Sequence, residues 1–198
     1  MGVHKIKSIK RPAIFLDRDG TLIRQVELLH IPSQIKIFSG VISAIKAFNK
    51  LGYLVVIVTN QPVVARGIIG LREVDRIHAV LVDRLGKKGA KIDAVYYCPH
   101  HPQATVKRYR IVCKCRKPRP GMVLRAAKEH NIDLKRSFLV GDSTQDVLAA
   151  NRAKVKMILV KTGHGGKDPW QHKGNPDFVV KSLSGAVSII KSFQNKND

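Results

Sequence analysis

Short apolar runs alternate with amphipathic stretches along most of this 198-residue chain. The apolar runs have the length of buried strands, and they cover residues 13–16, 53–58, 94–97, 138–140, 157–160 and 178–180. Between them, apolar residues recur at helical spacing, which predicts helices over residues 40–51, 71–85, 122–130, 147–153 and 186–193. We expect Ser39 to cap the first helix and Gly52 to end it. Alternating strands and helices predict an α/β fold, a Rossmann-like parallel sheet flanked by helices.

Length and spacing bound the domain organisation. At 22.0 kDa and 44% hydrophobic residues, the chain can bury one substantial core, so we predict a single domain over residues 13–194 behind a basic tail at residues 1–12. Too few residues separate the predicted strands for a large cap domain. No apolar run is long enough to span a bilayer, and the first residues lack the apolar segment of a signal peptide. We therefore expect a cytoplasmic protein without a membrane partner.

The charge balance is strongly basic, with 36 Lys and Arg against 14 Asp and Glu and a formal net charge of +22. Such a field speeds encounter with phosphorylated metabolites, and it equally favours adhesion to nucleic acid. Charge alone does not choose between these anions, and a generally solvated basic surface explains it equally well. We favour a small phosphorylated substrate over a nucleic-acid partner, because no segment resembles a dedicated nucleic-acid fold. We predict a monomer.

Polar residues follow several of the predicted strands. Asp17 and Asp19 come after the first strand, Thr59 and Asn60 after the second, and Asp142 after the strand at 138–140. The carboxyl ends of parallel strands share one edge of a sheet, so these side chains should converge. Each acid taken alone could be a turn or helix cap. Together they predict a Mg²⁺ site, with carboxylate ligands from Asp17 and Asp142 and the main-chain carbonyl of Asp19.

All three cysteines fall in the segment at 98–121 that interrupts the strand–helix alternation. Cys98 and His100 form one close pair, and Cys113 and Cys115 form the other, which predicts a zinc-binding loop over residues 98–115. Four protein ligands leave no open position, so this Zn²⁺ would be structural. His101 competes with His100 as the fourth ligand. The alternative is a set of reduced, buried cysteines beside an incidental histidine.

Residues 15–22 read FLDRDGTL and resemble the nucleophile motif of the haloacid dehalogenase superfamily. The resemblance implies a phosphatase in which Asp17 attacks phosphorus while Asp19 serves as acid and base. It also implies that Thr59 binds a phosphoryl oxygen and that Lys117 offsets the charge on the phosphoaspartate.

The metal motif follows in the expected order. Residues 141–146 read GDSTQD, which resembles the superfamily string that contains the metal ligand Asp142. Asp146 in this string either supports the metal ligands or simply leads its helix. Ser143 is a mild departure, since many relatives have lysine after this Asp.

The zinc segment narrows the resemblance to a subfamily that covers roughly residues 13–165. The strings CPHH at 98–101, CKCRKP at 113–118 and PGM at 120–122 resemble the bacterial D-glycero-D-manno-heptose 1,7-bisphosphate 7-phosphatases, whose zinc loop is shared with histidinol-phosphate phosphatases. This implies hydrolysis of the 7-phosphate in the biosynthesis of nucleotide-activated heptose for lipopolysaccharide and other surface glycans. The residues implied to bind the sugar and its second phosphate are Asn60, Gln61, Arg66, Arg116 and Lys117.

One loop departs from the family pattern. After Gln61 the family usually continues with Ser-Gly and an aliphatic residue, whereas this chain reads Pro62-Val63-Val64 before Ala65. Proline fixes φ and removes a donor, and valine cannot take a positive φ as glycine does, so the sugar specificity is open. The alternatives are a histidinol-phosphate phosphatase, a phosphatase of nucleic-acid 3′ ends, and a binding module that has lost turnover.

Overall fold

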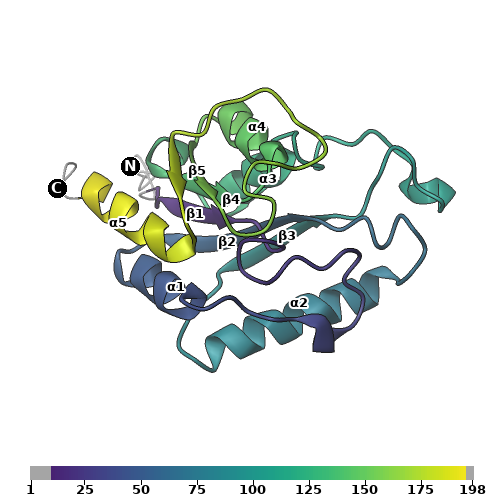
Figure 1. The fold of residues 1–198 in the computed structure, drawn as a ribbon, viewed down its shortest axis with the longest axis horizontal. Coiled ribbons are helices and arrows are strands. Elements are labelled where there is room, and N and C mark those ends of the chain that lie inside the picture. The colour runs from purple at the N-terminus through teal and green to yellow at the C-terminus, as the bar shows by residue number, and fades with distance from the viewer. Residues whose placement is uncertain (1–9, 195–198) are drawn as a thin grey trace, which may run out of the picture.

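A computed structural model describes residues 10–194. All six of its strands form one parallel sheet in the order β3-β2-β1-β4-β5-β6, shown edge-on in Figure 1. The strands are β1 (Ala13–Leu16), β2 (Leu54–Asn60), β3 (Ala94–Cys98), β4 (Phe138–Gly141), β5 (Lys156–Val160) and β6 (Phe178–Val180). The predicted α/β fold with a parallel sheet is confirmed, and the described residues contain no large cap between the strands.

Within residues 10–194, five α-helices cover the two faces of this sheet (Figure 1). They are α1 (Val41–Lys50), α2 (Leu71–Gly86), α3 (Gly121–Glu129), α4 (Thr144–Ala153) and α5 (Leu183–Gln194). Single 3₁₀ turns lie at η1 (Pro32–Gln34), η2 (Lys107–Tyr109) and η3 (Leu134–Arg136). In the described part of the chain, no helix is long and apolar enough to cross a membrane.

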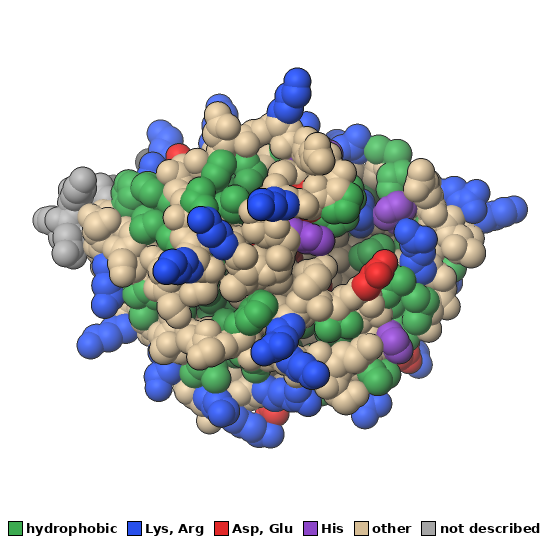
Figure 2. Space-filling view, viewed as in Figure 1, with side chains coloured by type: hydrophobic (Ala, Val, Ile, Leu, Met, Phe, Trp, Pro, Cys, Tyr) green, Lys and Arg blue, Asp and Glu red, His purple; other side chains and the backbone are tan. Residues whose placement is uncertain are grey.

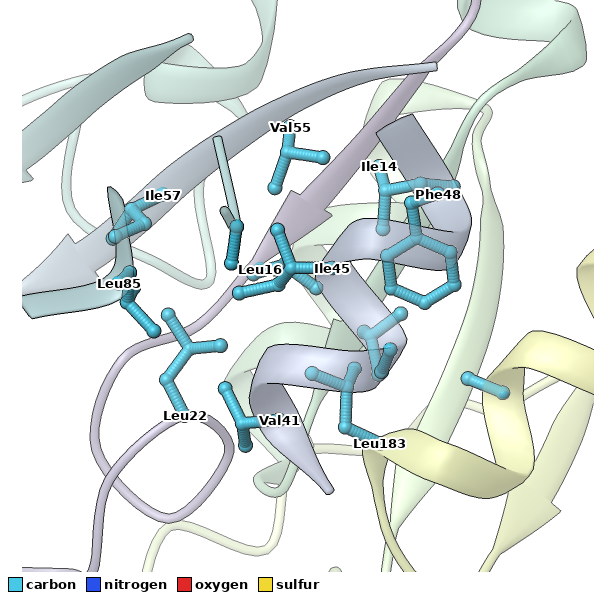
Figure 3. Packing of buried hydrophobic residues seen from close by; sticks show 14 of the residues in the cluster. Ile14, Leu16, Leu22, Val41, Ile45, Phe48, Val55, Ile57, Leu85 and Leu183 are labelled. Atoms are coloured by element: carbon cyan, nitrogen blue, oxygen red, sulfur yellow. The ribbon is translucent and has the colours of Figure 1, made fainter. Parts of the chain in front are cut away.

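Alternate residues of the strands point into two separate cores, as the two-residue repeat of a strand requires. Ile14 and Leu16 of β1 face the core under α1, α2 and α5, part of which Figure 3 shows around Ile45 and Phe48. Ala13 and Phe15 face the opposite core, which α3 and α4 cover. Because both faces are buried, the strands are continuous apolar runs rather than alternating ones.

The register of the central strands brings three chain segments together at one edge. Leu16 pairs with Ile57 of β2 and with Val140 of β4. The residues that directly follow these positions therefore lie side by side at the carboxyl edge of the sheet. This is where the polar residues of β1, β2 and β4 were expected to meet.

The predicted helix and strand boundaries were right to within a few residues, with two instructive differences. The predicted cap Ser39 is wrong: α1 begins at Val41, and its N-cap is Gly40, at φ 79°. Strand β2 runs two residues further than predicted, so Thr59 and Asn60 belong to its end and not to the loop. Residues 1–9 of the predicted basic tail lie outside the described residues, and Arg11 bonds to the backbone of Asn131 and Asp133.

A third, smaller apolar cluster joins residues 63–65 to α2 and to the 98–115 segment. Val63 and Val64 are almost fully buried there and pack with Val74, Ala104 and Tyr109. Val63 is not among the described residues with a positive φ. The loop that departs from the family pattern is therefore held by apolar packing, without the positive φ that a glycine would supply.

Candidate active site

Asp17 directly follows β1, and its amide donates to the carbonyl of Val140 on β4 (2.9 Å). Its Oδ1 accepts hydrogen bonds from the Arg18 amide (2.7 Å) and from Nζ of Lys117 (2.9 Å). The residue is only 8% exposed. Burial raises the pKa of Asp17 to about 7, and the negative charges of Asp146 and Asp19 add to this rise. The positive charge of Lys117 opposes it.

Lys117 reaches this carboxylate from the segment between β3 and α3. Its Nζ also donates to Asp146 (2.6 Å) and to the carbonyl of Val58 (3.0 Å), and the side chain is 3% exposed. Burial alone would lower the pKa of Lys117, but Asp146 and Asp17 outweigh it and raise the pKa above its ordinary value. The lysine therefore remains charged between two buried carboxylates. Asp146 also accepts from Ser143, which caps α4.

Three buried carboxylates share this corner of the sheet. One oxygen from each of Asp17, Asp142 and Asp146 lies within 4.8 Å of the other two. Burial and the two neighbouring acids raise the pKa of Asp142 to about 8. A Cβ added at Gly20 or Gly163 would collide with the Asp142 carboxylate, so the backbone closes tightly around it. A cluster of hard oxygen donors with one ammonium beside it fits a divalent cation such as Mg²⁺.

The Asp19 carboxylate lies outside this three-carboxylate cluster. It faces the guanidinium of Arg18 (2.9 Å at the shortest) and the Nε2 of Gln61 (3.1 Å). Gln61 donates through the same Nε2 to Oγ1 of Thr59 (3.0 Å). The predicted role of Asp19 at the metal is through its main-chain carbonyl, and it stays a prediction. The carboxylate itself lies at the wall of the cleft, 17% exposed.

Asn60 ties the end of β2 to the Lys117 segment. Its Oδ1 accepts from the Lys117 amide (3.0 Å), and its Nδ2 donates to the Lys117 carbonyl (3.1 Å) and to Oε1 of Gln145 (2.9 Å). With both ends of its amide engaged, Asn60 holds the lysine backbone in place. The structure therefore gives it a supporting contact in addition to its place on the cleft wall.

A cleft of about 570 Å³ opens above these residues. Arg66, His101 and Arg116 line one part of it, and His164 and Trp170 line another. Burial and the neighbouring Arg116 and Arg66 lower the pKa of His101. The cleft thus combines an acidic floor with basic walls. On the face of the molecule in Figure 2, Lys and Arg side chains are widely spread and Asp and Glu are few. Such a cleft suits a substrate that carries more than one phosphate.

The cysteine cluster lies at the end of β3. The Sγ atoms of Cys98, Cys113 and Cys115 are 3.1–3.4 Å apart, and Nδ1 of His100 is 3.5 Å from Cys115 and 3.7 Å from Cys98. The hydrogen bond between the Cys98 and Cys115 sulfurs lowers the pKa of Cys115 to about 5. His101 is not in this group. Its Nδ1 accepts from the Gln103 amide instead (3.1 Å), so the structure brings His100 to the cysteines and His101 to the cleft.

The predicted residues therefore fall into two clusters and one cleft wall, and some polar residues were missed. Arg18 and His78 are buried beside Asp19. Asp168, also buried, accepts from Thr144 and fastens the loop that carries Trp170 to the start of α4. His78 could have been noticed as a polar residue within the apolar face of a predicted helix. Arg18 and Asp168 lie in loops, where no periodicity marks a buried residue.

Comparisons with known proteins give one consistent result. A family model described as HAD-hydrolase-like matches residues 114–186. The D-glycero-beta-D-manno-heptose-1,7-bisphosphate 7-phosphatase of Photorhabdus laumondii is 38% identical over 184 residues, 92% of this chain and 97% of that protein. The enzyme of the same name from Pasteurella multocida is 39% identical over 186 residues, 93% of this chain and 100% of that protein.

The solved structures agree with the sequence relatives. The crystal structure of D,D-heptose 1,7-bisphosphate phosphatase from B. bronchiseptica, complexed with magnesium and phosphate, superposes with a TM-score of 0.81 at 30% sequence identity. The match covers 92% of this chain and 99% of that one.

Proposed function

Because the chain belongs to the D-glycero-beta-D-manno-heptose-1,7-bisphosphate 7-phosphatase family of haloacid dehalogenase-like hydrolases, we propose that it is a Mg²⁺-dependent phosphatase that removes the 7-phosphate of this heptose bisphosphate. The observation that carries the proposal is the position of Asp17. It lies on the acidic floor of a basic cleft, bonded to a buried lysine and within 4.8 Å of two further carboxylates. When bound, Mg²⁺ would offset charge between the carboxylates of Asp17 and Asp142 and the substrate phosphate.

The first half of the reaction forms a covalent intermediate. An oxygen of Asp17 bonds to phosphorus as the bond from phosphorus to the sugar oxygen breaks, and Asp19 gives its proton to that leaving oxygen. Lys117 favours the ionised form of Asp17 against the effect of burial and orients it through the 2.9 Å contact. Thr59, at the end of β2, is placed to donate to a phosphoryl oxygen as charge develops on it.

The second half restores the enzyme. Asp19, now a carboxylate, takes a proton from water as the water oxygen attacks phosphorus. The bond between phosphorus and Asp17 breaks, and inorganic phosphate leaves with its oxygen from water. Splitting hydrolysis into two transfers at one phosphorus lets a single acid–base residue serve both. Here that residue would be Asp19.

The walls of the cleft are proposed to hold the sugar and its second phosphate. Arg66 and Arg116 would meet the phosphate that is not cleaved, since guanidinium groups bind phosphate through paired hydrogen bonds. The Arg116 guanidinium is fixed by donation to the His100 carbonyl (3.1 Å). Asn60 and Gln61 would contact the sugar from the end of β2.

We propose that the Cys98, His100, Cys113 and Cys115 group binds a structural Zn²⁺. Its three sulfurs and one imidazole nitrogen lie within 4.8 Å of one another, and three cysteines with one histidine are a donor set typical of structural zinc. The Arg116 amide donates to Sγ of Cys113 (3.4 Å), which would stabilise a thiolate there. Zinc would order the segment that delivers Arg116 and Lys117 to the cleft. A reducing, cytoplasmic setting and a monomeric state, both predicted from the sequence, fit this proposal.

The experiment that tests the proposal compares three substrates in parallel. Mg²⁺-dependent phosphate release is measured on heptose 1,7-bisphosphate, histidinol phosphate and a 3′-phosphorylated oligonucleotide, with Asp17→Asn as control. We expect the heptose to be preferred and the control to be inactive. Preference for either other substrate would keep the mechanism and overturn the substrate, and steep salt dependence would accompany a nucleic-acid substrate. Tight substrate binding without turnover would identify a binding module instead.

A further inference from the structure

Arg18 is a fully buried arginine next to the proposed acid–base residue. It is 1% exposed, and its guanidinium forks onto the carboxylate of Asp19 through Nε (3.2 Å) and Nη2 (2.9 and 3.1 Å). Nη2 also donates to Oε1 of Gln61 (2.9 Å). Two atoms of one rigid plane, together with Nε2 of Gln61 (3.1 Å), therefore define where the Asp19 carboxylate points.

The remaining nitrogen of this fork is held by a histidine on α2. Nη1 of Arg18 lies 3.0 Å from Nε2 of His78, a side chain 5% exposed. Because a guanidinium only donates, Nε2 accepts and the ring proton is on Nδ1. Burial and the charge of Arg18 also lower the pKa of His78, to about 3, which keeps the ring neutral. Its Nδ1 has no hydrogen-bond partner among residues 10–194.

This arrangement is expensive if its only purpose is stability. A buried donor without a partner destabilises the folded state, and an apolar side chain on the same helix face would avoid that loss. The neighbours of His78 on the buried face of α2 are in fact apolar, namely Val74, Ile77, Leu81 and Leu85. The contacts run from His78 through Arg18 to the carboxylate of Asp19, whose orientation the proposed proton transfers require.

We propose that His78 is a positioning residue: through Arg18 it fixes the carboxylate of Asp19 for proton transfer to the leaving oxygen and from water. The inference rests on the proposed function, in which Asp19 is the acid and base. Without the acceptor on α2, Nη1 of Arg18 loses its partner in a buried site, and the fork turns toward other acceptors. Asp19 then turns with it, while Asp17, Lys117 and the metal carboxylates stay in place.

The test uses variants that differ in where they place an acceptor. His78→Leu removes it at similar volume, His78→Gln can put its amide oxygen near the position of Nε2, and His78→Asn can reach only as far as Nδ1. Tyr97→Phe is the matched control, because the Tyr97 ring packs on His78 (centroids 5.1 Å apart) but its hydroxyl bonds to Asp75. Thermal unfolding establishes the folded fraction of each variant.

The readout is leaving-group release in single turnovers with excess enzyme and Mg²⁺. Heptose 1,7-bisphosphate releases an alkoxide that must be protonated, whereas p-nitrophenyl phosphate releases a stable phenolate that needs no proton. We expect His78→Leu to lose roughly 10- to 100-fold in rate on the heptose and less than about threefold on the phenyl ester, with substrate affinity unchanged. His78→Gln should recover most of the loss and His78→Asn should not.

Equal losses on the two substrates, or none, in His78→Leu would overturn the inference. If that variant does not fold, identical rates for His78→Gln and His78→Asn on the heptose would overturn it instead. A wild type that hydrolyses both substrates through Asp17 keeps the proposed function even if this inference fails. A wild type that hydrolyses neither removes both.

Discussion

Replacing Lys117 by methionine removes the cation that lies between Asp17 and Asp146 while keeping most of the side-chain volume. Nζ of Lys117 is 2.9 Å from the first carboxylate and 2.6 Å from the second, and Asp146 is 0% exposed. Removing one partner of a buried ion pair costs about 3–5 kcal/mol, because the other charge is left without compensation. A domain of this size has a total stability of about 5–15 kcal/mol, so the loss should be large.

The assay is urea unfolding of wild type and Lys117→Met, with chelator and with saturating Mg²⁺. We expect a lower midpoint in chelator at an unchanged slope, and a greater Mg²⁺ stabilisation for the variant because its carboxylates lack the lysine charge. Turnover should be abolished in both conditions. Lys87→Met is the control, since its ion pair with Asp83 is solvent-exposed and should change stability by less than about 1 kcal/mol. A loss below about 1 kcal/mol in Lys117→Met would refute the reasoning.

Four further predictions follow from the same geometry. The raised pKa values of Asp17 (about 7) and Asp142 (about 8) favour the protonated acids at lower pH, so Mg²⁺ must displace protons when it binds. Calorimetry should therefore show that the affinity for Mg²⁺ rises with pH through this window. A Mg²⁺ affinity independent of pH would contradict this. Gly163→Ala should weaken Mg²⁺ binding at least about tenfold, because its Cβ would displace the Asp142 carboxylate at a φ of +61°; wild-type affinity by calorimetry would refute the steric argument. Purified protein should contain one zinc per chain, and Cys115→Ser should lower both the zinc content and the melting temperature; a folded, zinc-free wild type would exclude the site. Trp170 is the single tryptophan of the sequence, lines the cleft and is 47% exposed. Binding of heptose bisphosphate to Asp17→Asn should therefore change the tryptophan fluorescence. A constant spectrum at saturation would remove Trp170 from the cleft wall.

Much of the site could be predicted because it depends on backbone topology. Asp17, Thr59 and Asp142 are far apart in sequence, yet parallel strands must bring their carboxyl ends to one edge, and the structure does so. The close spacing of Cys113 and Cys115 likewise signals a metal site without knowledge of the fold. Both signals are properties of local pattern together with a single rule of sheet geometry.

The remaining contacts depend on side-chain directions that no periodicity encodes. The sequence left two roles for Asp146, either support of the metal ligands or the start of α4. Its ion pair with Lys117 is visible only in the folded structure, where the two segments pack together. The link from His78 to Asp19 through Arg18 joins a helix to a turn 60 residues away. His100 and His101 are adjacent in sequence. The course of the loop places His100 at the cysteines and His101 at the cleft.

The proposed mechanism requires that Asp17 becomes phosphorylated during turnover. The direct measurement is a rapid acid quench of the enzyme with Mg²⁺ and heptose 1,7-bisphosphate labelled at the 7-phosphate, followed by peptide mapping of the protein-bound label. We expect a transient label on Asp17 that hydroxylamine removes, that disappears without Mg²⁺ and that Asp17→Asn does not form. Full turnover with no label on Asp17, together with an active Asp17→Asn variant, would contradict it.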